Sequence, residues 1–150
     1  SDSQVSDAVR YELDPDALFK TSVALDYTIV AVTPPGDRQP VESWGVLRLN
    51  PHADPVPTEH VVIIQHPNGG PKQIVLTANA VLQVKRPYLH YSTDTMAGSS
   101  GSPVFNDMWQ VIALHHAVGP TLKLAGASQY SNEGVLLSAI KSDLGSIWPG

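Results

Sequence analysis

Residues 94–105 decide the fold, and their sequence is Asp94-Thr95-Met96-Ala97-Gly98-Ser99-Ser100-Gly101-Ser102-Pro103-Val104-Phe105. The middle of this stretch is a loop of small residues bracketed by glycines, and an apolar pair ends it. Small residues let the backbone turn so tightly that neighbouring amides can converge on one point. If the amides of Gly98 and Ser100 do so, they can stabilise a developing oxyanion, with Ser100 as the attacking hydroxyl. Taken alone, such a loop is more often an ordinary turn between strands.

Short apolar segments separated by proline and glycine lie on both sides of this loop. Of the 150 residues, 42% are hydrophobic and 15% are charged, which argues against disorder. The 13 prolines and 11 glycines favour short strands joined by turns. The pattern predicts an all-β antiparallel barrel or sandwich with one short terminal helix, capped by Ser138. The expected elements are strands at residues 27–32, 60–65, 73–77, 80–84, 88–91, 103–105, 110–114 and 134–137, a possible strand at 45–49, and a turn or helix start at 14–16.

Charge and composition exclude several kinds of partner. The net charge of -5 argues against nucleic acid, because phosphate binding needs a basic face. Cysteine is absent, which excludes disulfides and thiolate metal sites, and the longest wholly aliphatic runs have four residues, too few to span a bilayer. His115 and His116 are adjacent and would face opposite sides of a strand, so a histidine metal site is a weak hypothesis. We therefore expect no cofactor, no nucleic acid and no membrane partner, with a cytoplasmic location slightly favoured.

The loop and the segment after it carry a family resemblance. Residues 94–105, followed by 111–115, resemble the nucleophile region of chymotrypsin-fold serine proteases, most closely the disulfide-free bacterial branch that includes the glutamyl endopeptidases. That branch has Gly-x-Ser-Gly-Ser-Pro-Val-Phe with a histidine fifteen residues after the serine, and Ser100 and His115 keep this spacing. The resemblance implies a chymotrypsin-like double antiparallel β-barrel. This chain would carry the end of barrel one, an inter-barrel linker at residues 33–59, the complete barrel two and a short C-terminal helix.

The same resemblance implies a catalytic acid upstream of Ser100. In this fold the catalytic aspartate opens a buried strand, and Asp26 stands directly before the apolar residues 27–32. Its role would be to hold the imidazole of the base in the right tautomer and to stabilise the imidazolium. By itself, an acid at the start of a strand is usually a solvated strand end.

The base histidine of such a triad is missing. The fold requires the order His, Asp, Ser along the chain, but residues 1–25 contain no histidine. We favour a C-terminal part of a serine endopeptidase, in which a preceding segment or domain supplies the histidine and a peptide or protein is the substrate. The alternatives are a non-catalytic pseudoprotease that binds peptides, and a chain in which His66 or His116 has taken over the role of base.

The resemblance places substrate-binding residues before Ser100 and in the strand after it. Asp94, six residues before Ser100, would favour a substrate lysine or arginine, whereas Thr95 and His115 match residues that contact a substrate glutamate in glutamyl endopeptidases. The two signals conflict, because a carboxylate would repel a glutamate, and Asp94 turned away from the pocket is the third interpretation. The remaining expectations are that His116 and Val118 contribute to an edge where an extended peptide adds as a strand, and that Ser99, being uncharged, cannot pair with an N-terminal ammonium.

Overall fold

The computed structural model describes residues 9–33, 36, 40–52 and 54–148, which form two compact units. The first unit comprises residues 1–22 and 28–46, and the second comprises residues 23–27 and 47–150. In the first unit, β1 (Glu12–Ser22) pairs with β2 (Tyr27–Thr33), whose initial residue belongs to the second unit, and the short 3-10 helix η1 (Val41–Trp44) follows.

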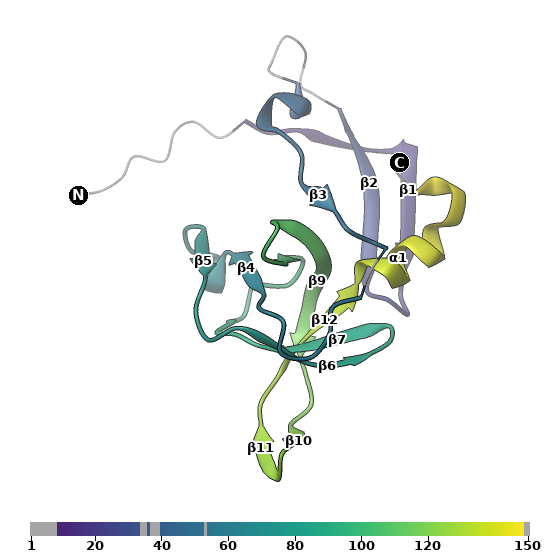
Figure 1. Cartoon of the computed structure of the whole chain (residues 1–150). Coiled ribbons are helices and arrows are strands. Elements are labelled where there is room, and N and C mark those ends of the chain that lie inside the picture. Colours follow the sequence, from purple (N-terminus) through teal and green to yellow (C-terminus); the bar gives the residue numbers. More distant parts are fainter. Residues whose placement is uncertain (1–8, 34–35, 37–39, 53, 149–150) are drawn as a thin grey trace, which may run out of the picture. The chain divides into compact units, whose positions relative to one another are not determined.

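The second unit is built on one curled antiparallel sheet (Figure 1). Its strands lie in the order β5-β4-β8-β9-β12-β7-β6, and β3 pairs in parallel with β9. A separate hairpin, β10 with β11, extends away from this sheet, and α1 follows β12 directly (Figure 1). The bounds are β3 (Arg48–Leu49), β4 (Val62–Gln65), β5 (Gln73–Val75), β6 (Ala80–Lys85), β7 (Tyr88–Ser92), β8 (Pro103–Phe105), β9 (Gln110–Val118), β10 (Leu122–Leu124), β11 (Ala127–Gln129), β12 (Asn132–Leu136) and α1 (Leu137–Leu144), with 3-10 helices η2 (Pro67–Gly69) and η3 (Gly145–Ile147).

The segment before β4 joins the two ends of this sheet. His60 forms an isolated antiparallel bridge with Ala80 at the start of β6. The amide of Thr58 donates to the carbonyl of Val81, and the amide of Val81 donates to the carbonyl of Glu59, both at 2.8 Å. Closure satisfies backbone groups that an open edge would expose, so this sheet forms a barrel.

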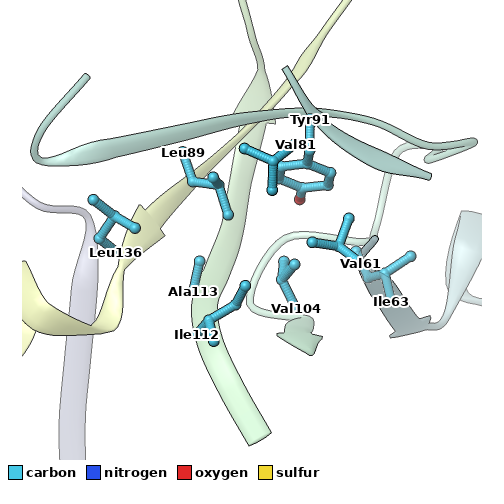
Figure 2. Close-up of a cluster of buried hydrophobic side chains, with 9 residues drawn as sticks. All are labelled: Val61, Ile63, Val81, Leu89, Tyr91, Val104, Ile112, Ala113 and Leu136. Atoms are coloured by element: carbon cyan, nitrogen blue, oxygen red, sulfur yellow. The ribbon is translucent and has the colours of Figure 1, made fainter. Parts of the chain in front are cut away.

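Apolar side chains from most of these strands meet inside the barrel. The cluster in Figure 2 comprises Val61, Ile63, Val81, Leu89, Tyr91, Val104, Ile112, Ala113 and Leu136, none of which is more than 4% exposed. Alternate residues of a strand face the same side, which is why β7 contributes Leu89 and Tyr91. This core holds β7 and β8, the two strands that the loop at residues 93–102 connects.

The all-β fold with a short C-terminal helix is confirmed, with local corrections. The expected strand at 45–49 is limited to Arg48–Leu49, and residues 14–16 lie inside β1 rather than in a turn or helix start. Pro15 is tolerated there because β2 is the one strand that pairs with β1 among the described residues. Ser138 does not cap α1: the capping position is Leu136, and the Ser138 hydroxyl donates to Asp54 instead.

The structure contains elements that the sequence pattern did not predict. Neither β1 nor the β10–β11 hairpin was predicted, and β9 continues four residues beyond the expected end at Leu114. Residues 33–59 contain η1 and β3, and their role as an inter-barrel linker stays a prediction. No helix in the described part of the chain is long and apolar enough to cross a membrane.

We predict that the closing segment is held in a pH-dependent way by His60. Its Nδ1 lies 2.7 Å from Asp107 Oδ1 and its Nε2 lies 2.9 Å from the Leu76 carbonyl. The Asp107 carboxylate, followed by the Leu76 carbonyl, raises the pKa of His60 above its usual 6.5. The protonated ring therefore stabilises the fold fully below pH 6.5, and this contribution is lost as the pH rises through the higher folded pKa.

Urea denaturation of wild type and His60→Gln at several pH values measures this effect. The difference between the two midpoints should be larger at about pH 5.5 than at about pH 8.5. A difference that is the same at both pH values would contradict the assignment.

Candidate active site

Two consecutive turns shape the loop between β7 and β8. The amide of Ser99 donates to the carbonyl of Met96, and the amide of Ser102 donates to the carbonyl of Ser99, both at 3.1 Å. Gly98 adopts φ +91°, a left-handed conformation that side chains disfavour. A Cβ at Gly98 would also lie 3.2 Å from the backbone nitrogen of Gly69. Glycine is therefore needed here for its backbone angle and for its lack of a side chain.

Strand β9 holds the end of this loop. The amide of Gly101 donates to the carbonyl of His115 at 2.7 Å, and the amide of His115 donates to the carbonyl of Ser102 at 2.9 Å. These two bonds continue the pairing of β8 with β9 past Pro103. The loop is consequently attached to the most extensively paired part of the sheet.

Successive serines of the loop face opposite ways. Ser99 is fully buried, whereas Ser100 is exposed and its Oγ donates to the carbonyl of His116 at 3.3 Å. In the described part of the chain, neither the Gly98 nor the Ser100 amide donates a backbone hydrogen bond. Two amides without a backbone acceptor therefore lie in the loop that also carries the exposed hydroxyl of Ser100.

Asp26, which is distant from Ser100 in sequence, also contacts β9. It lies in a turn at φ +48°, an angle that aspartate tolerates better than most residues, and it belongs to the unit that contains the barrel. Two bonds tie this turn down: Tyr27 donates to Asp143 at 2.5 Å, and Tyr88 donates to the Ala24 carbonyl at 3.5 Å. The Asp26 Oδ2 atom lies 3.3 Å from Nδ1 of His116.

His116 is therefore the residue at which Ser100 and Asp26 meet. Its carbonyl accepts from Ser100 Oγ, and its ring contacts the Asp26 carboxylate. The other ring nitrogen, Nε2, lies 2.9 Å from Oε1 of Glu133. Because both nitrogens face carboxylates, neither is free to take a proton from Ser100.

The arrangement agrees with a comparison of the sequence with family models. The model described as the trypsin-like peptidase domain matches residues 2–114. The chain belongs to this family. Solved structures of the Rv3671c protease from M. tuberculosis are similar in fold at 15% sequence identity, with a TM-score of 0.63 for the active form and 0.61 for the inactive form. The chymotrypsin-like fold expected from the sequence is thereby confirmed.

This trypsin-like peptidase domain spans only part of its relatives. The matches cover 93% of this chain and 60% of the active-form protease chain or 68% of the inactive one. The uncharacterized protein y4fB of Sinorhizobium fredii (strain NBRC 101917 / NGR234) is 33% identical over 142 residues, which cover 87% of this chain and 21% of that protein. The chain thus corresponds to about a fifth of that curated relative.

Two hollows lie beside the loop between β7 and β8 of the trypsin-like domain. One, of about 610 Å³, is lined by Asp94, Thr95 and Val118 together with residues of β7 and β12. The other, of about 410 Å³, is lined by Ser100 and Gly98 together with His66 and Lys72. Asp94 is the one acidic residue among those that line the first hollow. The side-chain amide of Gln65 donates to the backbone carbonyl of Asp94 at 2.9 Å.

The side chain of His115 faces the core and lines neither hollow. It is 5% exposed, and its Nδ1 lies 2.7 Å from the Tyr91 hydroxyl. Burial raises the pKa of Tyr91, so its hydroxyl keeps its proton and donates to His115. Burial, and then the charge of His116, lower the pKa of His115, which favours the neutral ring. The ring is therefore a hydrogen-bonded core group.

His66, the other proposed stand-in base, shares the second hollow with Ser100. Its Nδ1 lies 3.0 Å from the Gly70 carbonyl, and no hydrogen bond joins it to Ser100 in the described part of the chain. Sequence reasoning missed Glu133 and His90, which contact each other at 2.7 Å beside His116. The position of Glu133, an acid two residues before the apolar residues 135–137, was the available signal for it.

We predict that Gly98→Ala destabilises the domain more than Gly101→Ala. Both glycines have positive φ, +91° and +83°, but a Cβ at Gly101 meets nothing within 4 Å, whereas one at Gly98 meets backbone atoms of residues 66, 68 and 69. Gly101→Ala should cost about 1 kcal/mol of unfolding free energy for the backbone angle alone, and Gly98→Ala should cost about 1–3 kcal/mol more. Equal losses in urea denaturation would contradict the close packing at Gly98.

Proposed function

We propose that this chain is the part of a serine endopeptidase that carries the nucleophile Ser100 and the acid Asp26. The base histidine is supplied by a segment that precedes these residues in a longer protein. The observation that carries the proposal is that Ser100 and Asp26, 74 positions apart, both contact His116. A carboxylate and an exposed serine hydroxyl that contact the same residue support a site in which an imidazole bonds to both.

The reaction would proceed in the usual two stages of acyl transfer. The imidazole removes the proton of Ser100 as Oγ attacks the substrate carbonyl, and the amides of Gly98 and Ser100 donate to the oxyanion that forms. The imidazolium then protonates the leaving amine, while Asp26 keeps the ring oriented and stabilises its charge. Water releases the acyl group in the second stage by the same proton transfers in reverse.

The peptide substrate would lie along the exposed end of β9. Pairing of β8 with β9 ends at Leu114, and two loop bonds continue it to His115, so the edge of residues 116–118 that faces the loop has no strand partner in the described part of the chain. An extended peptide can add to such an edge through main-chain hydrogen bonds. His116 and Val118 would then contribute through their backbone, whereas both backbone groups of His115 are already bonded to Gly101 and Ser102.

The first hollow would take the side chain on the acyl side of the scissile bond. Its lining contains the carboxylate of Asp94, and that carboxylate has no hydrogen bond or ion pair in the described part of the chain. Asp94 is exposed, and a carboxylate beside a hollow attracts a cation and repels another carboxylate. We therefore propose a lysine or arginine preference rather than the glutamate preference that Thr95 and His115 suggested.

Labelling with a fluorophosphonate probe tests the proposed function. The 150-residue chain should label very slowly, because a serine without a base remains protonated and weakly nucleophilic. The chain extended by its preceding segment should label at Ser100, and Ser100→Ala should abolish the label. Asp26→Asn should slow labelling by up to about 10⁴-fold, the effect of a wrongly held base.

Two outcomes would contradict the proposal. Rapid stoichiometric labelling of the 150-residue chain would place the base within it. An extended chain that stays unlabelled but binds peptides would identify a pseudoprotease. Peptidyl phosphonates that carry arginine or glutamate next to the phosphorus extend the same assay to specificity, and faster labelling by the glutamate probe would contradict the role given to Asp94.

A further inference from the structure

Four ionisable side chains form a continuous hydrogen-bonded row on three neighbouring strands and the turn above them. His90 on β7 contacts Glu133 on β12 with Nε2 to Oε2 at 2.7 Å. Glu133 contacts His116 on β9 with Oε1 to Nε2 at 2.9 Å, and His116 contacts Asp26 with Nδ1 to Oδ2 at 3.3 Å. The acid proposed for catalysis is therefore the outer end of a row that begins in the barrel.

Both ring nitrogens of His116 face carboxylates, so a ring with a proton on each nitrogen could donate to both. A neutral imidazole has one N–H and could donate to only one of the two carboxylates, leaving a lone pair facing the other. The ring also stacks on Tyr88, with centroids 5.6 Å apart and planes 9° from parallel, and an aromatic face attracts a cation. A cationic His116 between Glu133 and Asp26 satisfies both carboxylates at once.

Burial increases along the row towards its inner end. The side chain of Asp26 is 72% exposed, those of His116 and Glu133 are 19% and 18% exposed, and that of His90 is 4% exposed. A mostly buried carboxylate needs donors, and Glu133 receives one from each histidine. His90 Nδ1 is enclosed without a partner in the described part of the chain, so the His90 proton belongs on Nε2, where it meets Glu133.

Tight packing fixes the inner end of the row. A Cβ at Gly119 would lie 3.1 Å from Cδ2 of His90 and 2.5 Å from Oγ of Ser131. Ser131 in turn donates to the Pro120 carbonyl at 2.7 Å. With His90 held by backbone on one side and Glu133 on the other, the position of Glu133 is fixed, and so is that of His116.

We propose that His116 is a positioning residue for Asp26, and that Glu133 and His90 hold His116 in place. The proposal rests on the proposed function, in which Asp26 orients the base. A largely exposed carboxylate in a turn rotates freely unless one oxygen is held. His116 binds Oδ2 and leaves Oδ1 for the imidazole of the base, and its ring lies between the carboxylates of Asp26 and Glu133.

Kinetics of the extended, base-containing protein test the catalytic part of this proposal. His116→Gln should lower kcat about tenfold while KM changes less than about twofold, because an orienting contact acts on the chemical step rather than on substrate binding. Glu133→Gln should lower kcat by a similar factor. The matched control is His60→Gln, which removes another imidazole bonded at both nitrogens, including to a carboxylate, and should leave kcat unchanged. Equal kcat values for His116→Gln and His60→Gln would overturn the proposal.

Nitrogen-15 NMR of the histidine rings in the 150-residue chain tests the contacts without any activity. The two His116 nitrogens are assigned through their correlations with the carbon-bound ring protons. Asp26→Asn should move the Nδ1 signal, and Glu133→Gln should move the Nε2 signal. A His116 spectrum that Asp26→Asn leaves unchanged would overturn the proposal, whereas an extended protein without activity would overturn the proposed function while the NMR result still decides whether His116 holds Asp26.

Discussion

Strand β9 is the element on which both the fold and the site depend. It pairs with β8 on one side and with β12 on the other, so its position in the barrel is fixed by two ladders of hydrogen bonds. The Gly101–His115 and His115–Ser102 bonds then attach the nucleophile loop to it. His116, the next residue, contacts Ser100 through its carbonyl and Asp26 through its ring. Without the β9 pairing, no residue would hold Ser100 and Asp26 in fixed positions relative to each other.

The period of two along a strand separates structural from functional side chains. His115 faces the core and bonds to Tyr91, while His116 faces the carboxylates. Ser99 is likewise buried and Ser100 exposed. A shift of one residue in the register of β9 would exchange the two histidines and remove the contact with Asp26, so the buried core indirectly specifies the site.

Much of barrel two could be predicted from the sequence because its strands are short, apolar and β-branched between clear turns. The loop at 98–103 and the strand after Asp26 were predictable for the same reason, since their signals are local. The strand β1 was missed because a proline and two aspartates lie inside it, and local preference is overridden there by pairing with β2. Ser138 was misassigned because its hydroxyl finds Asp54, which is distant in sequence.

The predicted site residues also separate into those with a local sequence signal and those whose contacts depend on the tertiary fold. Asp94, Thr95 and Val118 line one hollow, and their role in substrate binding stays a prediction. The contact between the His115 ring and the Tyr91 hydroxyl could not be predicted from spacing along the sequence. The row from His90 to Asp26 depends on three strands in lateral contact, and lateral order is a tertiary property. Its members are 90 positions apart at the widest contact, Asp26 with His116.

The central claim is that barrel two presents Ser100 and Asp26 in the geometry of a catalytic triad that an upstream histidine completes. A crystal structure of the extended protein after reaction with a fluorophosphonate tests it most directly. The claim predicts phosphorus bonded to Ser100 Oγ, a phosphoryl oxygen between the amides of Gly98 and Ser100, and an imidazole from a residue before Asp26 bonded to its Oδ1. A phosphonate on another residue, or an Asp26 carboxylate with no imidazole beside it, would contradict the claim.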